Sequence, residues 1–484
     1  MKLRDLLHAI PVLDIWGNAD TEISSLTFDS RDVKEGSLFV AVRGERADGH
    51  DFIPEVVERG GRAVLVNEMP ETKREGVTYV CVHDTAYALG VAASNYYGNP
   101  SRELKLVGIT GTNGKTTTAT LLYQLFEKLG YSVGLISTIE NRISKEAFPA
   151  KYTTPDPIST NKLLSEMIEA GCDYCFMEVS SHAIAQQRIA GLHFAGGVFT
   201  NITHDHLDFH ETFDKYIQAK KSFFDNLDRH AFALSNVDDK NGRVMLQNTF
   251  AHSKTYALKS MADFRLKVVE SHFEGTLLKI DNSEEVWVRL VGTFNAYNLL
   301  AVYGVAILLE QETLKVLTAL SDLQPAEGRF EITTSKRGVI GIVDYAHTPD
   351  ALKNVLKTIR GLKKIGQKVI TVIGCGGDRD VSKRPEMAET SCRYSDSVIL
   401  TSDNPRTEDP GKIILDMEKG VSEDVKRKVF SITDREEAIK AACHIAQEND
   451  VILIAGKGHE TYQEIDGKRF PFDDMEILNK QFNS

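Results

Sequence analysis

Residues 104 to 120 read LKLVGITGTNGKTTTAT, and this stretch decides the fold. A short apolar run leads into a glycine-rich loop, and an amphipathic stretch follows, as a strand, a turn and a helix would. Gly130 is typical of a helix end. This order predicts a phosphate-binding loop in a parallel α/β sheet. The predicted apolar stripe of the helix is Ala119, Leu122, Leu125, Phe126 and Leu129.

The spacing of this loop departs from the common pattern of a glycine, four residues and then Gly-Lys-Ser/Thr, because no glycine lies five positions before Gly114. Gly108, Gly111 and Gly114 still let the backbone approach phosphate, and N–H groups before a helix form an anion cradle. Lys115 would reach the terminal phosphates, and Thr116 could bind magnesium. The shift indicates a nucleotide-binding family other than the common kinases and GTPases.

Length and composition bound the class of protein. A chain of 484 residues suggests about three domains. Hydrophobic residues at 42% and charged residues at 26% are ordinary for a globular protein. The net charge of -12 argues against general affinity for nucleic acid or anionic membranes, so an anionic ligand must meet local positive charge. The N-terminus lacks a signal-like apolar run and no stretch is long enough to span a membrane, so we expect a cytoplasmic protein. Separately, we expect a monomer.

Six cysteines are too few for a disulfide framework and fit a reducing compartment. Cys172 and Cys175 form one C-x-x-C, but no second pair lies at zinc-finger distance. Their stretch reads as a buried strand. We interpret these two residues as core thiols.

The chain is expected to form three α/β domains. Short strands such as SLFVAV and RAVLV occupy residues 1–98, which end at the breaker GNPS. Residues 99–332 hold the phosphate loop and form a central ATP-binding, parallel-sheet domain. Residues 333–484 alternate strands and helices, which predicts a Rossmann-like C-terminal domain. Its expected strands are GVIGIV, KVITVI, SVILTSD, KVFSI and VILIAG.

Four polar motifs follow strands of this last domain. Ligands of parallel sheets bind outside the carboxyl ends of the strands, so we expect these loops to share one edge. The motifs are DYAHTPD (344–350), GCGGDRD (374–380), SDNPR (402–406) and GKGHE (456–460).

A further polar cluster lies in the central domain, in residues 176–188 and 197–226. Glu178 ends an apolar strand and His206 lies just beyond the next one, so both could face the phosphates and hold a divalent ion. A histidine-rich turn taken alone is often only a solvated loop or an incidental zinc site, but beside a phosphate loop this cluster favours magnesium chemistry.

Together these motifs resemble the Mur ligases, the amide-forming enzymes of peptidoglycan assembly. The resemblance extends from FDSR (28–31) through GKGHE, with many short motifs in register. It implies an ATP-dependent, ADP-forming acid–amino-acid ligase of cell-wall biogenesis. In this family the γ-phosphoryl group of ATP moves to a substrate carboxylate, and an amine attacks the resulting acyl phosphate. The motifs that carry the resemblance are TGTNGKTTT, TTPDP, EVSSHAI, NITHDHLDFH, GTFNAYN, EGRFE, DYAHTPD, DNPR and GKGHE.

The resemblance also implies cofactor contacts. Magnesium would be held by Thr116, Glu178, His206 and a carbamylated Lys220, because a carbamate replaces an unfavourable cation with oxygen ligands. With Lys115, the last three would be catalytic. The implied ATP contacts are Gly111, Thr112, Asn113, Gly114, Lys115, Thr116, Thr117, Asn295, Arg329 and Asp344, with His347 nearby.

The implied acceptor is UDP-N-acetylmuramoyl-L-alanyl-D-glutamate. Its uridine diphosphate end would be held by Phe28, Ser30, Glu45, Arg46 and Ala47. Its muramoyl peptide would be held by Thr153, Thr154, Ser180, Gln186 and Arg188. Tyr152 stands where the family can carry asparagine.

The incoming amino acid would be meso-diaminopimelate, which differs from lysine by a distal carboxylate. Arg406 offers a planar fork matched to that carboxylate, and lysine-adding relatives lack this arginine. Arg379 supplies a second cation, and Asp403, Asn404 and Glu460 can take ammonium groups. Pro405 and Gly456 complete the implied amino-acid site.

Three alternatives remain open at this point. A lysine-adding ligase is disfavoured by Arg406. Folylpolyglutamate synthase shares the ATP core but is disfavoured by the segment from FDSR to HDF. A nucleotide-dependent switch protein would explain the phosphate loop, but it would not explain Lys220 or the four C-terminal loops.

Overall fold

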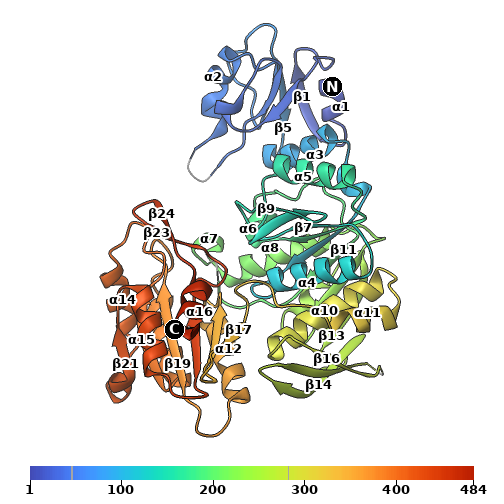
Figure 1. The fold of residues 1–484 in the computed structure, drawn as a ribbon. Helices are drawn as coiled ribbons and strands as arrows, with labels where there is room; N and C mark the ends of the chain where they lie inside the picture. Colours follow the sequence, from blue (N-terminus) through green and yellow to red (C-terminus); the bar gives the residue numbers. More distant parts are fainter. Residues whose placement is uncertain (45–46, 206, 282, 484) are drawn as a thin grey trace. The chain divides into compact units, whose positions relative to one another are not determined.

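The computed structural model describes residues 1–44, 47–205, 207–281 and 283–483, without the side chains of 207 and 208 (Figure 1). The chain divides into two units. The first comprises Met1–Gly111, Thr118–Ile202 and Phe209–Tyr256, and the second comprises Thr112–Thr117, Thr203–Asp208 and Ala257–Ser484. Mixed and parallel sheets flanked by helices confirm the predicted α/β class.

The first sheet of unit one lies in the N-terminal residues and has the strand order β1-β5-β4-β3-β2. Only β1 and β5 pair antiparallel. Its strands are β1 (Val12–Trp16), β2 (Ser25–Thr27), β3 (Ser37–Val40), β4 (Ala63–Val66) and β5 (Thr78–Val82). Buried side chains of α3 (Thr85–Tyr96) and α1 (Leu3–Leu6) share a core cluster with this sheet, and α2 (Ile53–Glu58) contributes to a second.

The second sheet of unit one is built around β6 (Lys105–Thr110), a strand buried over most of its length. Neighbouring strands are parallel from β13 to β7, in the order β13-β12-β11-β6-β10-β7, and β8 and β9 add antiparallel. These strands are β7 (Val133–Ile136), β8 (Glu140–Ile143), β9 (Glu146–Pro149), β10 (Tyr174–Glu178), β11 (Gly196–Phe199), β12 (Phe232–Asn236) and β13 (His252–Ala257). Cys172 and Cys175 lie in its core cluster, as interpreted from the sequence.

The helix after the phosphate loop, α4, spans Lys115–Lys128. The predicted stripe is fully buried from Ala119 to Phe126, whereas Leu129 lies past the helix end and is half-buried. Gly130 has a φ of 95°, the left-handed conformation that favours glycine at a helix end. The other helices that lie wholly or partly in the first unit are α5 (Pro157–Glu169), α6 (Ser181–Ala185), α7 (Leu207–His210), α8 (Phe213–Asp225) and α9 (Gly242–Met245).

The C-terminal sheet belongs to the second unit and has the order β17-β18-β22-β19-β20-β21, with only β17 antiparallel. The five predicted strands are confirmed. The strands are β17 (Glu331–Thr334), β18 (Ile340–Asp344), β19 (Val369–Cys375), β20 (Ser397–Ser402), β21 (Val429–Ser431) and β22 (Val451–Ala455).

Helices cover both faces of this C-terminal sheet (Figure 1). One face packs against α12 (Pro349–Leu362), α13 (Lys383–Tyr394) and α14 (Pro410–Glu418). The other packs against α15 (Arg435–Ile445) and α16 (Asp474–Asn483). Burial on both faces explains why β18, β19, β20 and β22 read as continuous apolar runs rather than alternating ones.

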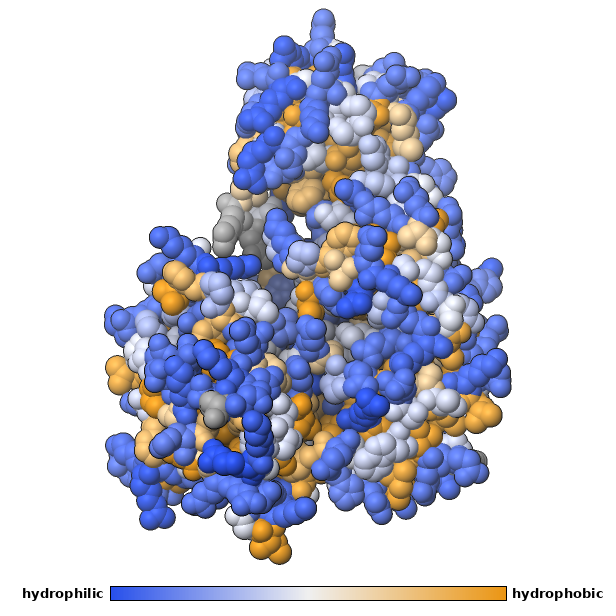
Figure 2. All heavy atoms as spheres, viewed as in Figure 1, coloured by the Kyte–Doolittle hydropathy of each residue, from blue (hydrophilic) through white to orange (hydrophobic). Residues whose placement is uncertain are grey.

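The second unit also contains two antiparallel ribbons and two further helices. The first ribbon is β14 (Phe264–His272), β15 (Gly275–Ile280) and β16 (Glu285–Val288), and the second is β23 (Tyr462–Ile465) with β24 (Lys468–Pro471). The helices are α10 (Thr293–Leu308) and α11 (Thr313–Leu320). On the face drawn in Figure 2, hydrophobic side chains are scattered among hydrophilic ones. Within the described residues, no helix is both long and apolar enough to cross a membrane.

Candidate active site

The phosphate loop is shaped by glycines that no other residue could replace without strain. Gly114 has a φ of 88°, and a Cβ there would lie 2.5 Å from Oδ1 of Asn298. In the first unit, a Cβ at Gly111 would lie 1.9 Å from Oγ1 of Thr200. The backbone at both positions therefore approaches its surroundings as closely as a phosphate cradle requires.

Two contacts hold the loop within the second unit. The Lys115 ammonium donates to the carbonyl of Thr112 at 2.9 Å. The hydroxyl of Thr112 accepts from the amide of Thr203 at 3.0 Å, which ties the loop to the NITHDH segment. The structure thus places Lys115 and Thr112 in the loop that the sequence predicted. His206, from the same segment, lies outside the described residues.

Arg329 links the end of this loop to the start of the C-terminal sheet. Its guanidinium donates to Oγ1 of Thr116 at 3.2 Å and lies over the ring of Tyr345, 4.5 Å from the ring centroid. Two predicted ATP residues, Thr116 and Arg329, are therefore in direct contact. Asp344, which ends β18, directly precedes Tyr345 in the sequence.

Asp344 is buried, and its carboxylate accepts from the amides of Phe330 at 2.7 Å and Ala346 at 2.8 Å. Burial raises its pKa to about 6, while Arg329 and the two amides act in the opposite direction. The carboxylate therefore braces the EGRFE and DYAHTPD segments against each other. The exposed His347 side chain packs edge-on against Tyr345, with ring centroids 4.7 Å apart.

Glu178 and Lys220 are the predicted metal ligands that lie in the first unit. Glu178 ends β10, is fully buried, and accepts from the amide of Thr138 at 2.7 Å and its hydroxyl at 3.2 Å. Lys220 lies on α8, is 1% exposed, and donates to the carbonyl of Gly111 at 3.1 Å. Because β6 and β10 are parallel neighbours, Gly111 and Glu178 lie at the same sheet edge.

The residues predicted to hold the muramoyl peptide are brought together in the first unit. Thr154 donates to the carbonyl of Glu178 at 2.8 Å, and its hydroxyl accepts from the amide of Ser180 at 3.1 Å. Arg188 donates to the carbonyl of Thr154 at 3.1 Å and also to the side chain of Gln186. Thr153 accepts from the hydroxyl of Thr138 at 3.1 Å. The exposed ring of Tyr152 lies 5.8 Å from the Arg188 guanidinium.

The residues predicted to hold the uridine diphosphate lie in the N-terminal segment of the first unit. Phe28 is 41% exposed and Ser30 is buried. The carbonyl of the exposed Ala47 accepts from the amide of Gly44 at 3.0 Å. Glu45 and Arg46 lie outside the described residues.

The four motif loops of the C-terminal sheet meet at the carboxyl edge, as predicted. The amide of Gly377 donates to the carbonyl of Asn404 at 2.9 Å. A Cβ at Gly456 would lie 2.6 Å from Oδ2 of Asp403, and one at Gly458 would lie 2.7 Å from Cβ of Tyr345. GCGGDRD therefore packs against SDNPR, and GKGHE packs against both SDNPR and DYAHTPD.

Two cations flank Gly376 in this cluster. A Cβ there would lie 2.9 Å from Nη1 of Arg406 and 3.8 Å from Cγ of Arg379. The Arg379 side chain is exposed, whereas that of Arg406 is 23% exposed and its Nε lies 4.0 Å from the carboxylate of Glu464. The Arg406 guanidinium near this loop is suited to bind a carboxylate.

The buried Asn404 contacts one of the carboxylates of the cluster. Its amide nitrogen donates to Glu460 at 2.7 Å. Burial, followed by the nearby charge of Asp403, raises the pKa of Glu460, and Lys457 opposes this rise. The arrangement offers negative charge for ammonium groups beside positive charge for carboxylates, which matches a diamino diacid.

Sequence reasoning missed Asn298 beside the phosphate loop and Lys457 in the C-terminal loop cluster. Asn298 faces Gly114 and lies 3.3 Å from the predicted ATP contact Asn295, which is itself buried and donates to the carbonyl of Val291. Lys457 is fully buried between Asn404 and Glu460. The signal for Asn298 was its place in GTFNAYN, and that for Lys457 was a lysine between two glycines in GKGHE.

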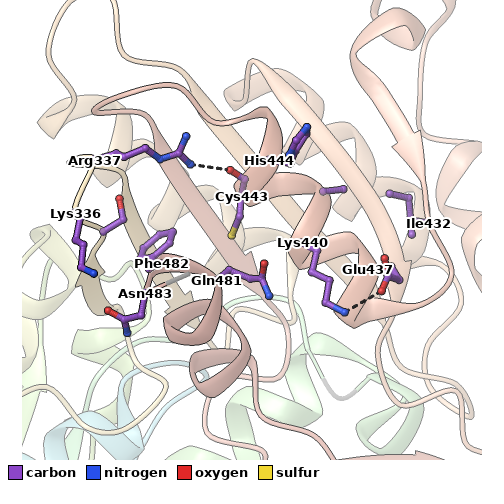
Figure 3. A pocket seen from close by; sticks show the side chains of 12 residues that line it. Lys336, Arg337, Ile432, Glu437, Lys440, Cys443, His444, Gln481, Phe482 and Asn483 are labelled. Atoms are coloured by element: carbon purple, nitrogen blue, oxygen red, sulfur yellow. Dashed lines mark hydrogen bonds and ion pairs between the residues drawn. The ribbon is translucent and has the colours of Figure 1, made fainter.

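A cavity of about 860 Å³ lies elsewhere in the second unit (Figure 3). It is lined by Lys336 and Arg337, which precede β18, by His444 and Cys443 of α15, and by Phe482 of α16. This places it near the amino ends of the strands, while the motif loops leave the carboxyl ends. None of the described site residues predicted from the sequence lines it.

Models of three Mur ligase domains match the chain in order. The "Mur ligase family, catalytic domain" matches residues 22–97, the "Mur ligase middle domain" matches 109–306, and the "Mur ligase, glutamate ligase domain" matches 328–458. The chain belongs to the Mur ligase family. The three models together cover residues 22–97, 109–306 and 328–458, and Glu460 and β23 lie beyond the last of these ranges.

Curated Mur ligases resemble the chain over its full length. A UDP-N-acetylmuramoyl-L-alanyl-D-glutamate–2,6-diaminopimelate ligase of Cytophaga hutchinsonii is 55% identical over 99% of both chains. A ligase of the same name from Bacteroides fragilis is 55% identical over 100% of this chain and 99% of its own. A less similar relative of this name, from Clostridium tetani, is 41% identical over 99% of both chains.

Solved structures agree with this assignment. A structure of a UDP-N-acetylmuramoyl-L-alanyl-D-glutamate–2,6-diaminopimelate ligase matches with a TM-score of 0.72 and 29% identity, covering 100% of this chain and 98% of its own. MurF of Thermotoga maritima in complex with ADP matches with a TM-score of 0.64 and 21% identity, covering 96% and 97%. The second likeness supports the fold alone.

Proposed function

We propose that this chain is the ATP-dependent ligase that joins meso-diaminopimelate to UDP-N-acetylmuramoyl-L-alanyl-D-glutamate, the reaction named for its full-length relatives of the MurE type. The observation that carries the proposal is the Arg406 guanidinium beside Gly376, in the same loop cluster as Asp403 and Glu460. Arg379 follows on the same loop as Gly376. A lysine substrate would leave a guanidinium without its carboxylate, which is how a polar site rejects an analogue.

The reaction proceeds through phosphoryl transfer. An oxygen of the substrate carboxylate takes the γ-phosphoryl group of ATP, and ADP leaves. The amine nitrogen of diaminopimelate then attacks the acyl carbon, phosphate leaves, and the nitrogen loses a proton. Phosphoryl transfer depends mainly on positioning and on neutralising charge. The glycine cradle and Lys115 suit that task, and Asn295, Arg329 and Asp344 are proposed to serve the base and ribose of ATP.

The residues present suit a magnesium ion, because hydroxyl and carboxylate oxygens are the donors that this hard cation prefers. We propose Thr116 and Glu178 as ligands, with His206 and a carbamylated Lys220 contributing as the family resemblance implies. The burial of Lys220 against the carbonyl of Gly111 supports a modification that removes its positive charge. When bound, the metal would neutralise phosphate charge.

The acceptor is proposed to bind through the N-terminal and central segments. Phe28, Ser30 and the 45–47 loop would take the uridine diphosphate. The Thr154, Ser180 and Arg188 network would take the muramoyl peptide, with Thr153 and Gln186. The domains are proposed to run from 1 to 98, from 99 to 332 and from 333 to 484. The protein is proposed to act as a monomer in the cytoplasm, a reducing compartment in which its six buried thiols stay reduced.

The test is product analysis with ATP, the UDP-muramoyl dipeptide and one amino acid at a time. A new amide with diaminopimelate, released together with ADP, supports the proposal. A stronger reaction with lysine would favour a lysine-adding ligase. ADP without any new amide would favour a nucleotide switch.

A further inference from the structure

The fully buried Lys457 is a cation without an assigned role in the amino-acid cluster of the second unit. Its ammonium donates to Oδ1 of Asn404 at 3.1 Å and to Oε2 of Glu460 at 3.1 Å, and lies 5.5 Å from the ring centroid of Tyr462. Removing a charge from water is costly, so a buried lysine is kept where it is well paired. Here its partners are two residues proposed to receive the substrate.

The first effect of Lys457 is to orient the Asn404 amide. The Oδ1 atom of Asn404 accepts from Lys457 and from the amide of Glu464 at 2.9 Å, so its nitrogen is turned toward Glu460, which accepts at 2.7 Å. Reversing the amide would place two donors face to face. Lys457 thereby fixes which groups Asn404 and Glu460 present.

The second effect is electrostatic. Burial and the charge of Asp403 both raise the pKa of Glu460, whereas Lys457 lowers it through its charge and its hydrogen bond. A carboxylate must be ionised to attract an ammonium group. Lys457 therefore favours the charged form of Glu460 in a place where a second carboxylate disfavours it.

The local backbone gives Lys457 this position. Gly456 and Gly458 on either side have φ values of 115° and 52°, and a Cβ at Gly456 would lie 2.6 Å from Asp403. These two glycines let the loop pass close to Asp403 on one side and Tyr345 on the other. The lysine between them enters the interior beneath the loop.

We propose that Lys457 is a positioning residue for the incoming amino acid: it holds Asn404 and Glu460 in the orientation that receives an ammonium group of the diamino acid. This rests on the proposed function, since diaminopimelate is the substrate whose binding Lys457 would control. Lys457 itself stays beneath the loop and acts through these two neighbours.

The test compares Lys457→Met with Lys428→Met. Lys428 is a matched control because it also donates to two acceptors of the second unit, the carbonyls of Cys392 at 2.6 Å and Ser395 at 2.8 Å, outside the amino-acid loops. The KM for diaminopimelate, the KM for ATP and the thermal midpoint are measured for each. We expect Lys457→Met to raise the KM for diaminopimelate roughly tenfold or more while the KM for ATP stays within about twofold.

Parallel rises in both KM values, or a lowered thermal midpoint with an unchanged KM for diaminopimelate, would overturn the proposal. If the methionine variant does not fold, Lys457→Gln, which keeps a donor but no charge, is measured in the same way and judged by the same results. Wild-type turnover with diaminopimelate is measured first. Failure there overturns the proposed function, whereas failure confined to the variants overturns only the role of Lys457.

Discussion

The guanidinium of Arg406 donates a hydrogen bond to the carbonyl oxygen of Gly377 at 2.7 Å. The backbone of Arg406 has a φ of 52°, which is unusual for a residue other than glycine. The β23–β24 ribbon holds it there, because its amide donates to the carbonyl of Glu464 at 3.0 Å and its carbonyl accepts from Asp466 at 2.7 Å. The direction of this side chain is therefore set before any substrate binds.

Replacing Arg406 by alanine should impair the use of diaminopimelate. The lost guanidinium would remove a charge-assisted contact to the distal carboxylate, which we expect to lower kcat/KM for diaminopimelate about a hundredfold, or roughly 3 kcal/mol. The KM for ATP should change little. Arg393→Ala is the control, because that exposed arginine pairs with Glu389 on α13. A fall in ATP affinity with unchanged diaminopimelate kinetics would refute the assignment.

Gly114→Ala should disturb the phosphate loop through contact with Asn298. The added Cβ would lie 2.5 Å from Oδ1 of Asn298, at a φ of 88° that disfavours alanine. We expect a loss of about 1–3 kcal/mol in unfolding free energy. In the Gly114→Ala, Asn298→Ala double variant, the clash is relieved and part of this loss should return. Strictly additive effects in denaturant unfolding would show that the two residues are not coupled.

Lys220→Ala should abolish turnover, and short carboxylates added to the variant should restore part of it. The added acid would supply the oxygens that a carbamate supplies in the wild type. Lys221→Ala is the control, since Lys221 is also buried on α8 but pairs with Asp225 and the carbonyl of Gln247. No rescue at any concentration of acetate or formate would count against a carbamate at Lys220.

Asp344 should make stability depend on pH. Its folded-state pKa of about 6 lies above its ordinary value of 3.8, so its stabilising contribution is full below 3.8 and is lost as pH rises through about 6. A difference of that size corresponds to roughly 3 kcal/mol. Relative to Asp344→Asn, the wild type should therefore lose unfolding free energy across this window. Parallel pH profiles of the two proteins in urea unfolding would contradict the raised pKa.

Much of the fold followed from local patterns. The run LKLVGI and four of the five C-terminal apolar runs are largely buried strands, whereas KVFSI forms the largely exposed edge strand β21. Each motif loop leaves the carboxyl end that its position after a strand implied. The apolar stripe of α4 was also recognisable, because its period is fixed by helix geometry. These features are determined by residues that lie close together in the chain, so the sequence alone can predict them.

The contacts that complete the sites depend instead on segments far apart in the chain. Nothing in the sequence showed that Asn298 would face Gly114, or that Arg329 would donate to Thr116. The left-handed backbone of Arg406 depends on the distant β23 strand. The sequence did not single out Lys457, because burial of its charge requires Asn404 and Glu460, which only folding brings to it. Such tertiary contacts produce no periodic pattern in the sequence, so they could not be predicted from it.

The most direct measurement is the initial rate of amide formation, followed by mass spectrometry of the nucleotide product, with meso-diaminopimelate and lysine compared at equal concentration in the presence of ATP and the UDP-muramoyl dipeptide. The account predicts a product carrying diaminopimelate, formed at least about a hundredfold faster than the lysine product. An equal or faster reaction with lysine, or ADP release without any amide, would contradict it.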